Sequence, residues 1–242
     1  MSKEREKEIL KVLLAKKKVS VPELSKQLYI SESSVRRDLM RLEKQQLIKR
    51  VHGGAIIEEN SVSSLKIPFV IRELEQSDAK IAIAKKAIEY INDCDVIFLD
   101  ASSSAYALVP YLTTKHQLTV ITSGIKTLLA LGEYGIKAIS TGGDLVSSEQ
   151  ALVGEECYKT IAAFNADAAF FSCRGLSDDG LMTDISPEEV YVRRRMIAQS
   201  KNAYLMCASE KIGKKYTHNL GSIREITAVL SEKELPAQLN CK

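Results

Sequence analysis

Several residue types are scarce in this chain of 242 residues, which has no tryptophan, three histidines and five cysteines. No apolar run approaches the roughly 18 residues that a transmembrane helix requires, so we expect no membrane partner. The amino terminus is charged throughout and has no apolar segment typical of a signal peptide. These absences favour a cytoplasmic protein.

The cysteines form no C-x-x-C pair and are odd in number, which is typical of reduced thiols rather than a disulfide framework. They are Cys94, Cys157, Cys173, Cys207 and Cys241. The three histidines are widely separated and have no partner at ligand spacing, so the sequence predicts no metal site. We also expect no cofactor.

The segment Glu32 to Gln45 predicts a helix with one apolar side and one basic side. Val35, Leu39 and Leu42 share a narrow sector of the helical wheel. The opposite side carries hydroxyls and cations: Ser33, Arg36, Arg37, Met40, Arg41 and Lys44. Such a helix suits the major groove of DNA, where arginine binds guanine or phosphate. A solvated basic helix is the alternative interpretation.

The flanking segments favour the DNA-binding interpretation. Residues 5–16 have helical apolar spacing, and Ser20 to Glu23 fits the start of a short second helix. Ser31 then serves as the cap of the basic helix, which completes a helix-turn-helix. Downstream, residues 47–51 (LIKRV) and 55–57 (AII) flank His52-Gly53-Gly54, a hairpin signal that predicts a wing.

Charge is distributed unevenly between the two parts of the chain. Residues 1–57 contain 14 Lys and Arg against 7 Asp and Glu, a balance of +7, whereas the remainder has 20 against 24, a balance of −4. A basic head on a mildly acidic body is typical of a DNA-binding domain joined to another domain. We expect the head to contact DNA through Ser31, Ser33, Ser34, Arg36, Arg37, Arg41, Arg50, His52 and Gly53.

The rest of the chain predicts one α/β domain over residues 76–242, after a linker over residues 58–75. Short apolar runs alternate with helical segments, which indicates a mainly parallel, Rossmann-like sheet. The predicted strands are 96–99, 118–121, 136–139, 168–171, 203–206 and 226–230. Ligands in such sheets bind beyond the carboxyl ends of the strands.

The residues that follow these strands predict an anion-binding site. Asp100 to Ser104 places three consecutive hydroxyls at a helix start, which suits a phosphate group. Lys211 follows a later strand and supplies a counter-charge. The full set of candidate effector residues is Asp100, Ser102, Ser103, Ser104, Ser123, Gly142, Gly143, Arg174 and Lys211. Each segment taken alone also fits an ordinary loop.

The segment SVRRDLMRLEKQQLIKRVHGGA from Ser34 to Ala55 resembles the head of DeoR-type bacterial transcriptional regulators. Further along the chain, LDASSSA, TGGDLVSSEQALVG and CASEKIG are similar to landmarks of the sensor domain in that family. The resemblance implies a winged helix-turn-helix joined to a sensor that is similar in fold to ribose-5-phosphate isomerase. It also implies binding of operator DNA and of a phosphorylated sugar or related metabolite.

Four positions depart from the family pattern. Tyr29 and Ser102 stand where glycine is usual, and Arg174 and Ala208 stand where aspartate is usual. Loss of two hydrogen-bond acceptors and gain of a cation favour a more anionic ligand with fewer hydroxyls, if Arg174 faces the site. The alternative is that Arg174 points to solvent or to a neighbouring subunit.

Three functions are compatible with these patterns. The first is a repressor of carbohydrate-metabolism genes, dimeric or tetrameric, controlled by an anionic metabolite. The second is a phosphosugar isomerase, which needs a general base that the strand-end loops do not single out, so we expect no enzyme. The third is a constitutive DNA-binding protein whose α/β domain only oligomerises.

Overall fold

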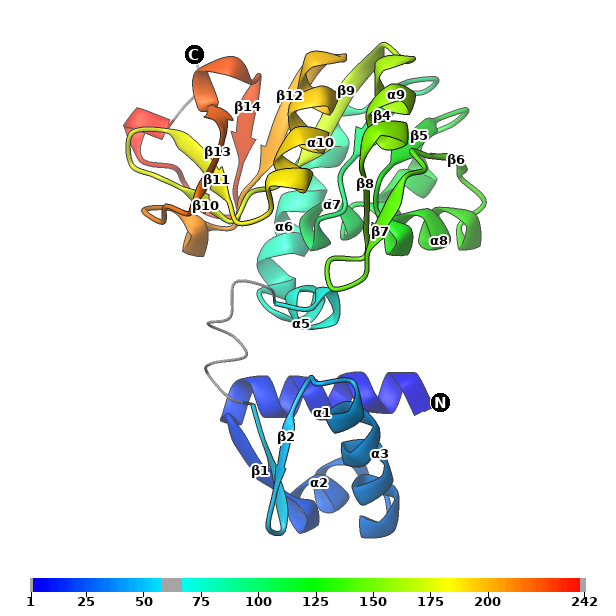
Figure 1. Ribbon diagram of the computed structural model, residues 1–242, viewed down its shortest axis with the longest axis vertical. Coiled ribbons are helices and arrows are strands. Elements are labelled where there is room, and N and C mark those ends of the chain that lie inside the picture. Colours follow the sequence, from blue (N-terminus) through cyan, green and yellow to red (C-terminus); the bar gives the residue numbers. More distant parts are fainter. Residues whose placement is uncertain (1, 58–66, 240–242) are drawn as a thin grey trace. The chain divides into compact units, whose positions relative to one another are not determined.

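The computed structural model describes residues 2–57 and 67–239, and the side chains from residue 4 onward. It divides into two compact units, Met1–Glu75 and Gln76–Lys242, which we call the head and the sensor unit and describe separately (Figure 1). No helix among the described residues combines the length and apolar character needed to span a membrane.

The head is a winged helix-turn-helix, as predicted. Its elements are α1 (Ser2–Lys16), β1 (Lys18–Ser20), α2 (Val21–Leu28), α3 (Glu32–Lys44), β2 (Lys49–Val51), β3 (Gly54–Ile56) and α5 (Phe69–Leu74). Val35, Leu39 and Leu42 are all buried in one apolar core with residues of α1 and α2. The predicted caps are present, because the Ser20 and Ser31 hydroxyls each accept a backbone N–H at 3.3 Å. The hydrophobic stripe therefore places α3 against the core by one side only.

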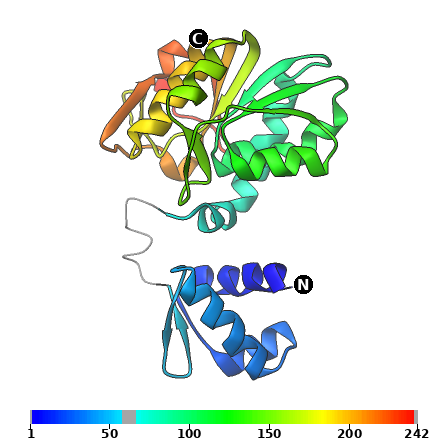
Figure 2. The ribbon, with the colours of Figure 1, turned by 45° about the vertical axis from the view of Figure 1, so that its right-hand side comes forward.

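The wing is a tight antiparallel hairpin in which Val51 pairs with Gly54 across His52-Gly53. Gly53 has the positive φ that the turn requires, at 77°. Gly54 is needed for a different reason, because a Cβ there would lie 2.2 Å from the carbonyl oxygen of Val19 in β1. The third strand, β1, was not predicted, and it pairs with β3 along Lys18–Ser20. Figure 2 shows the hairpin loop at the end of the head opposite α1.

The expectation of a linker over residues 58–75 is corrected at its carboxyl end. Phe69–Leu74 forms the helix α5. Ile71 is buried in the core of the head, and Lys7 of α1 contacts Glu73 at 2.9 Å. The burial of Ile71 and the ion pair between Glu73 and Lys7 explain why this segment folds against the head. Residues 58–66 lie outside the described part of the chain.

The sensor unit is built on a six-stranded sheet in which all adjacent strands are parallel. The order is β14-β12-β9-β4-β5-β6. The bounds are β4 (Val96–Leu99), β5 (Thr119–Thr122), β6 (Lys137–Ser140), β9 (Ala166–Phe171), β12 (Ser200–Met206) and β14 (Ala228–Leu230). Each corresponds to a predicted strand. This agreement confirms the α/β class and the parallel sheet.

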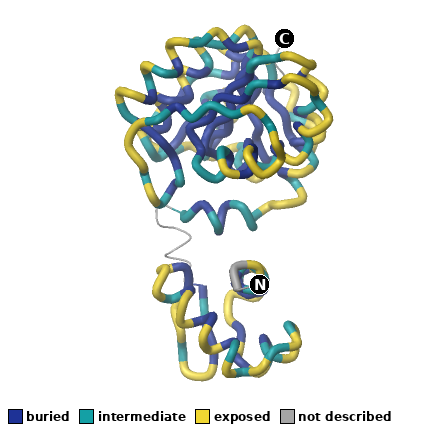
Figure 3. The backbone as a smooth tube through the Cα atoms, turned by 90° about the vertical axis from the view of Figure 1, so that its right-hand side faces the viewer, coloured by how far each residue is buried: buried dark blue, intermediate teal, exposed yellow. Residues whose placement is uncertain are grey.

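Helices cover both faces of this sheet, which explains the continuous apolar runs within its strands. Ile97 and Leu99 pack on one face with α6 (Ser77–Ala87), and Phe98 packs on the other with α9 (Glu155–Ala162). Figure 3 shows the buried strands inside the sensor unit. The remaining helices are α7 (Ser103–Tyr106), α8 (Ile125–Glu133), α10 (Pro187–Ala198), and the 3-10 turns Ile88–Tyr90, Val109–Thr114, Ser209–Lys211, Ile223–Glu225 and Ala237–Leu239.

Two small antiparallel sheets were not predicted. One is the hairpin β7 (Asp144–Val146) and β8 (Ala151–Val153), and the other comprises β10 (Gly175–Leu176), β11 (Leu181–Asp184) and β13 (His218–Ser222). Their strands contain two to five residues each, which is too short for a periodic hydrophobic signal. Two of these strands, β7 and β10, begin directly after the candidate effector residues Gly143 and Arg174.

Tyr29 is the basis of a stability prediction. It ends α2 in the left-handed region, with φ 55°, and its side chain is 94% exposed. Glycine adopts this conformation without the steric cost of about 1 kcal/mol that an L-residue bears, and little packing is lost. We therefore expect Tyr29→Gly to raise the stability of the head by about 0.5–1 kcal/mol.

Urea unfolding of the full chain, followed by circular dichroism, checks this expectation. Gln27→Gly is the matched control, because residue 27 is also exposed but lies within the helix α2. It should lower stability by about 1 kcal/mol. A loss of stability in both variants would show that the turn carries no strain.

Candidate DNA interface and effector site

The three arginines of α3 differ in their surroundings. The Arg36 guanidinium contacts Glu32 at 2.6 Å, one turn earlier on the same helix. The Arg37 guanidinium donates to the Ser34 hydroxyl at 3.4 Å, a weak contact with a neutral group. Both side chains are exposed. Arg37 therefore offers its charge to an external anion with less competition than Arg36.

Arg41 belongs to an ion network that joins α1 to α3. Asp38 is fully buried, and its two carboxylate oxygens accept from Arg5 at 2.5 and 3.0 Å. Arg41 contacts Asp38 at 3.2 Å and Glu6 at 3.2 Å. Because breaking a buried ion pair leaves a charge unpaired, this network holds the two helices together. Arg41 thus has a structural role that the sequence analysis did not anticipate.

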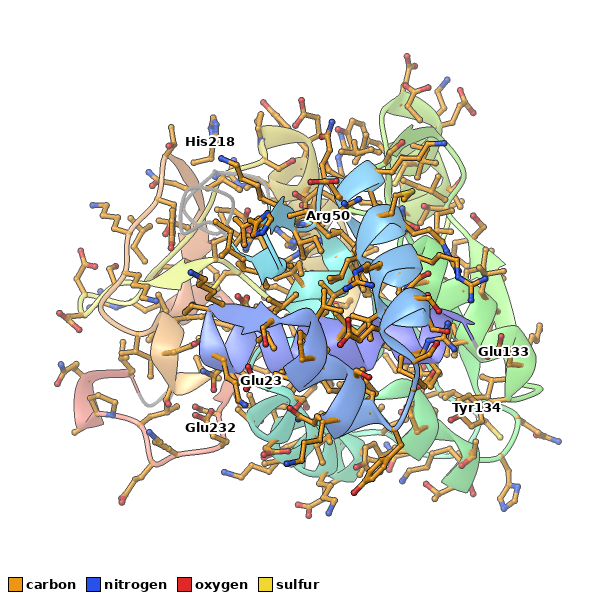
Figure 4. The ribbon with its side chains drawn as sticks, turned by 90° about the horizontal axis from the view of Figure 1, so that it is seen from below. Glu23, Arg50, Glu133, Tyr134, His218 and Glu232 are labelled. Atoms are coloured by element: carbon orange, nitrogen blue, oxygen red, sulfur yellow. The ribbon has the colours of Figure 1, made fainter. Side chains whose placement is uncertain are left out.

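The predicted wing contacts lie at and beside the hairpin loop. His52 and Gly53 are exposed in the loop itself. Arg50 lies beside α3 (Figure 4), and its guanidinium is 3.7 Å from Glu43 of that helix. The backbone N–H of Arg50 also donates to Glu43 at 2.9 Å. These contacts fix the start of the wing relative to α3.

The predicted hydroxyl-rich segment of the sensor unit is organised around Asp100. The Asp100 carboxylate is 1% exposed and directly follows β4. Its Oδ1 accepts from the Ser102 N–H at 3.1 Å and from the Ser102 hydroxyl at 2.5 Å. Its Oδ2 accepts from the Ser172 N–H at 3.2 Å. Asp100 therefore orders the loops that follow β4 and β9.

Arg193 was not predicted, and it is the central cation of this region. Its guanidinium is buried and contacts three carboxylates: Asp100 at 2.7 Å, Asp184 at 2.7 Å and Glu189 at 3.0 Å. Burial alone would lower the pKa of Arg193, but the three carboxylates outweigh it and hold the pKa well above its ordinary value. The arginine is therefore charged under all ordinary conditions. An arginine in mid-helix gives no sequence signal of such a role.

Lys211 reaches the same region from the turn that follows β12. Its ammonium group donates to the Ser172 hydroxyl at 2.9 Å, and that hydroxyl donates to the Met206 carbonyl at 2.7 Å. Since Ser172 also donates its N–H to Asp100, the two predicted parts of the anion site are connected through one serine. The structure therefore brings Lys211 close to the Asp100 loop.

The hydroxyls of Ser102, Ser103 and Ser104 are not equivalent. Ser102 caps α7 by accepting the Ala105 N–H at 3.1 Å, so its oxygen is already used. The hydroxyl of Ser104 is buried and has no hydrogen-bond partner within the described chain. A buried hydroxyl without a partner is costly, which suits a group that bonds a ligand. Because α7 has a single turn, its dipole adds little attraction for an anion.

Ser123, Gly142 and Gly143 follow the neighbouring strands β5 and β6. The loop after β5 approaches the loop after β4 closely, because a Cβ on Gly124 would lie 3.1 Å from the Ala101 Cα. The Ser123 carbonyl accepts the N–H of Leu152 in β8 at 2.7 Å. A Cβ on Gly143 would lie 2.2 Å from a carbonyl oxygen of β8. Ser123 and Gly143 therefore pack against the unpredicted β7–β8 hairpin.

Arg174 faces this hairpin. Its guanidinium lies 3.9 Å from the carboxylate of Glu149, and the two side chains are 18% and 4% exposed. The carboxylate that accompanies Arg174 thus comes from the turn between β7 and β8. Sequence reasoning did not select Glu149, although it lies within TGGDLVSSEQALVG, because nothing local to that segment indicates a pairing with Arg174.

Two thiols lie at the carboxyl ends of the paired strands β9 and β12. Cys173 and Cys207 are buried and hydrogen-bonded to each other, which raises the pKa of Cys173 and lowers that of Cys207. Burial further raises the pKa of Cys173. No disulfide joins the four described cysteines, and Cys241 lies outside the described residues.

Family models match both units of the chain. The DeoR-like helix-turn-helix domain matches residues 5–61, and the DeoR C terminal sensor domain matches residues 75–233. The fold of the sensor unit is also similar to eIF2B delta from Chaetomium thermophilum, with 16% identity, a TM-score of 0.50, and coverage of 69% of this chain and 62% of that one. Ribose 5-phosphate isomerase A from Methanocaldococcus jannaschii has 13% identity, a TM-score of 0.44 and coverage of 57% and 55%.

Relatives with similarity along the whole chain are transcriptional regulators. The glycerol-3-phosphate regulon repressor of Escherichia coli is 30% identical over 91% of this chain and 87% of its own length. The L-fucose operon activator of Haemophilus influenzae is 30% identical, with coverage of 97% and 94%. The lactose phosphotransferase system repressor of Staphylococcus epidermidis is 30% identical, with coverage of 93% and 90%. The chain therefore belongs to the DeoR family of DNA-binding transcriptional regulators, and the relatives that it matches are named as regulators, not as enzymes.

Proposed function

We propose that this regulator represses carbohydrate-metabolism genes and responds to a phosphorylated sugar or a related anionic metabolite. The DNA-binding part is supported by the exposed outer face of α3, on which the Arg37 guanidinium hydrogen-bonds, among the described residues, to a neutral hydroxyl alone. Two relatives are named as repressors, one of the glycerol-3-phosphate regulon and one of the lactose phosphotransferase system. They support repression rather than activation, and a phosphorylated ligand.

In this proposal α3 enters the major groove and the wing lies against the backbone or minor groove. Arg37 binds a guanine edge or a phosphate, and Ser31, Ser33 and Ser34 at the helix start contact the adjacent backbone. Arg36 binds the DNA as well, after its ion pair with Glu32 has broken. Arg41 serves mainly to hold α3 on α1, because it contacts both Glu6 and Asp38.

The effector part of the proposal depends on the connected set Asp100, Ser172 and Lys211. The phosphate group binds Lys211 together with the Ser103 and Ser104 N–H groups, which have no acceptor within the helix because they open α7. The buried Ser104 hydroxyl donates to the same ligand. Asp100 repels phosphate and instead holds the loop in shape. A second acidic group on the ligand would replace Glu149 as the ion-pair partner of Arg174.

Assembly as a homo-oligomer also belongs to the proposal. One winged helix contacts too few base pairs for tight and specific binding, so two heads are needed on repeated half-sites. The sensor unit is the larger folded body and is the proposed source of the contact between subunits. Such a regulator acts in the compartment that holds the DNA.

Arg37→Ala should weaken operator binding by about 1–3 kcal/mol, or roughly 5- to 150-fold, if Arg37 forks onto a base. Fluorescence anisotropy with a DNA site obtained by in vitro selection measures the loss. Arg195→Ala is the matched control, since Arg195 is an exposed arginine on α10 of the sensor unit. Equal affinity of the two variants would contradict the docking of α3. A uniform loss on all sequences, with a shallower salt dependence, would assign Arg37 to phosphate.

Lys211→Ala should abolish the response to the metabolite and leave ligand-free operator binding intact, because Lys211 supplies the counter-charge of the phosphate. Thermal melting with a panel of sugar phosphates and glycerol 3-phosphate identifies the response. A ligand at 100 times its Kd adds about 2.7 kcal/mol to the stability of the protein that binds it. Lys214→Ala, an exposed neighbour, is the control. A normal response in the Lys211 variant would place the effector elsewhere.

Residues 76–242 expressed alone should self-associate, whereas residues 1–75 should remain monomeric and bind DNA weakly. The two fragments follow the division of the chain into compact units, so neither cuts α5. Analytical ultracentrifugation at tens of micromolar measures their masses. A monomeric sensor fragment would contradict the proposed assembly.

A further inference from the structure

Met40 occupies the centre of the outer face of α3. Ser33, Arg37, Met40 and Lys44 follow one another at three- and four-residue spacing and so form one stripe along the helix. This stripe lies opposite the buried residues Val35, Leu39 and Leu42. Met40 is 56% exposed. Its position makes it the one large apolar side chain of that stripe.

The two other arginines of α3 flank this stripe and are engaged with acids. Arg36 contacts Glu32 on one side, and Arg41 contacts Glu6 and Asp38 on the other. The middle of the helix face therefore presents a guanidinium, a thioether and, at its ends, a hydroxyl and an ammonium group. A single exposed methionine is unremarkable on a general surface, but this face is the one that meets the bases.

We propose that Met40 reads the C5-methyl group of a thymine in the operator. The thymine methyl is the apolar feature of the major groove, and an apolar side chain distinguishes it from cytosine and from the purines. A flexible, unbranched thioether adapts readily to such a contact. The inference rests on the proposed docking of α3 in the major groove.

The spacing of Met40 and Arg37 makes the inference more specific. Three residues of helix advance about 4.5 Å along the axis, and adjacent base pairs are about 3.4 Å apart. The two side chains thus reach base pairs one or two steps apart. Since arginine prefers guanine, each half-site should contain a guanine and a thymine at that separation.

Replacement of single thymines by uracil in the selected operator tests the inference, because uracil lacks only the methyl group. One position per half-site should lower the affinity of the unmodified protein about three- to fivefold, as expected for one buried methyl. The same replacement should have no effect on Met40→Ala. Met40→Leu keeps an apolar contact and should retain the sensitivity to uracil.

Leu129→Ala is the matched control, because Leu129 is 64% exposed on α8 of the sensor unit. It should bind and discriminate like the unmodified protein. Equal sensitivity of Met40→Ala and the unmodified protein to every uracil replacement would overturn the inference. If the Met40 inference is overturned but Arg37→Ala still lowers operator affinity, the proposed docking of α3 in the major groove stands. If neither Arg37→Ala nor Met40→Ala lowers operator affinity, the proposed docking is wrong as well.

Discussion

The buried guanidinium of Arg193 is the interaction on which the architecture of the sensor unit depends. It contacts Asp100 after β4, Asp184 at the end of β11 and Glu189 on the same helix. Three carboxylates cannot be buried together without a cation, so the arginine holds these segments in one place. Asp100 then positions Ser172, which contacts Lys211. Arg193 thus determines the geometry of the proposed anion site, although it does not contact the proposed ligand itself.

The head also depends on an ion-pair network with a buried charge at its centre. Asp38 is buried between α1 and α3 and is held by Arg5 and Arg41. This assignment divides the basic residues of α3 by function, because a cation engaged with a buried carboxylate is not available to DNA at low cost. The basic character of a helix therefore overstates its capacity to bind DNA, and the contacts of each side chain decide its role.

The antiparallel additions bring further residues to the candidate effector site. The parallel sheet is common to many α/β proteins and establishes only that strand ends meet at one edge. The β7–β8 hairpin brings Glu149 to Arg174 and packs against Gly143. Where the family pattern has aspartate, this chain has an arginine that is accompanied by a carboxylate from elsewhere in the chain. The charge of Arg174 is therefore accompanied by a carboxylate within the sensor unit.

The sequence by itself determined the features that arise from local patterns. The stripe of Val35, Leu39 and Leu42 oriented α3, the serine caps defined helix starts, and apolar runs identified the six parallel strands. Hydrophobic periodicity and capping act over a few residues, so they can be read directly. Tertiary structure alone decided that β1 joins the wing, that α5 packs on the head and that Arg193 meets Asp100 across 93 positions. Ion pairs between distant residues leave no periodic signal, because their energy depends on burial that only the folded chain creates.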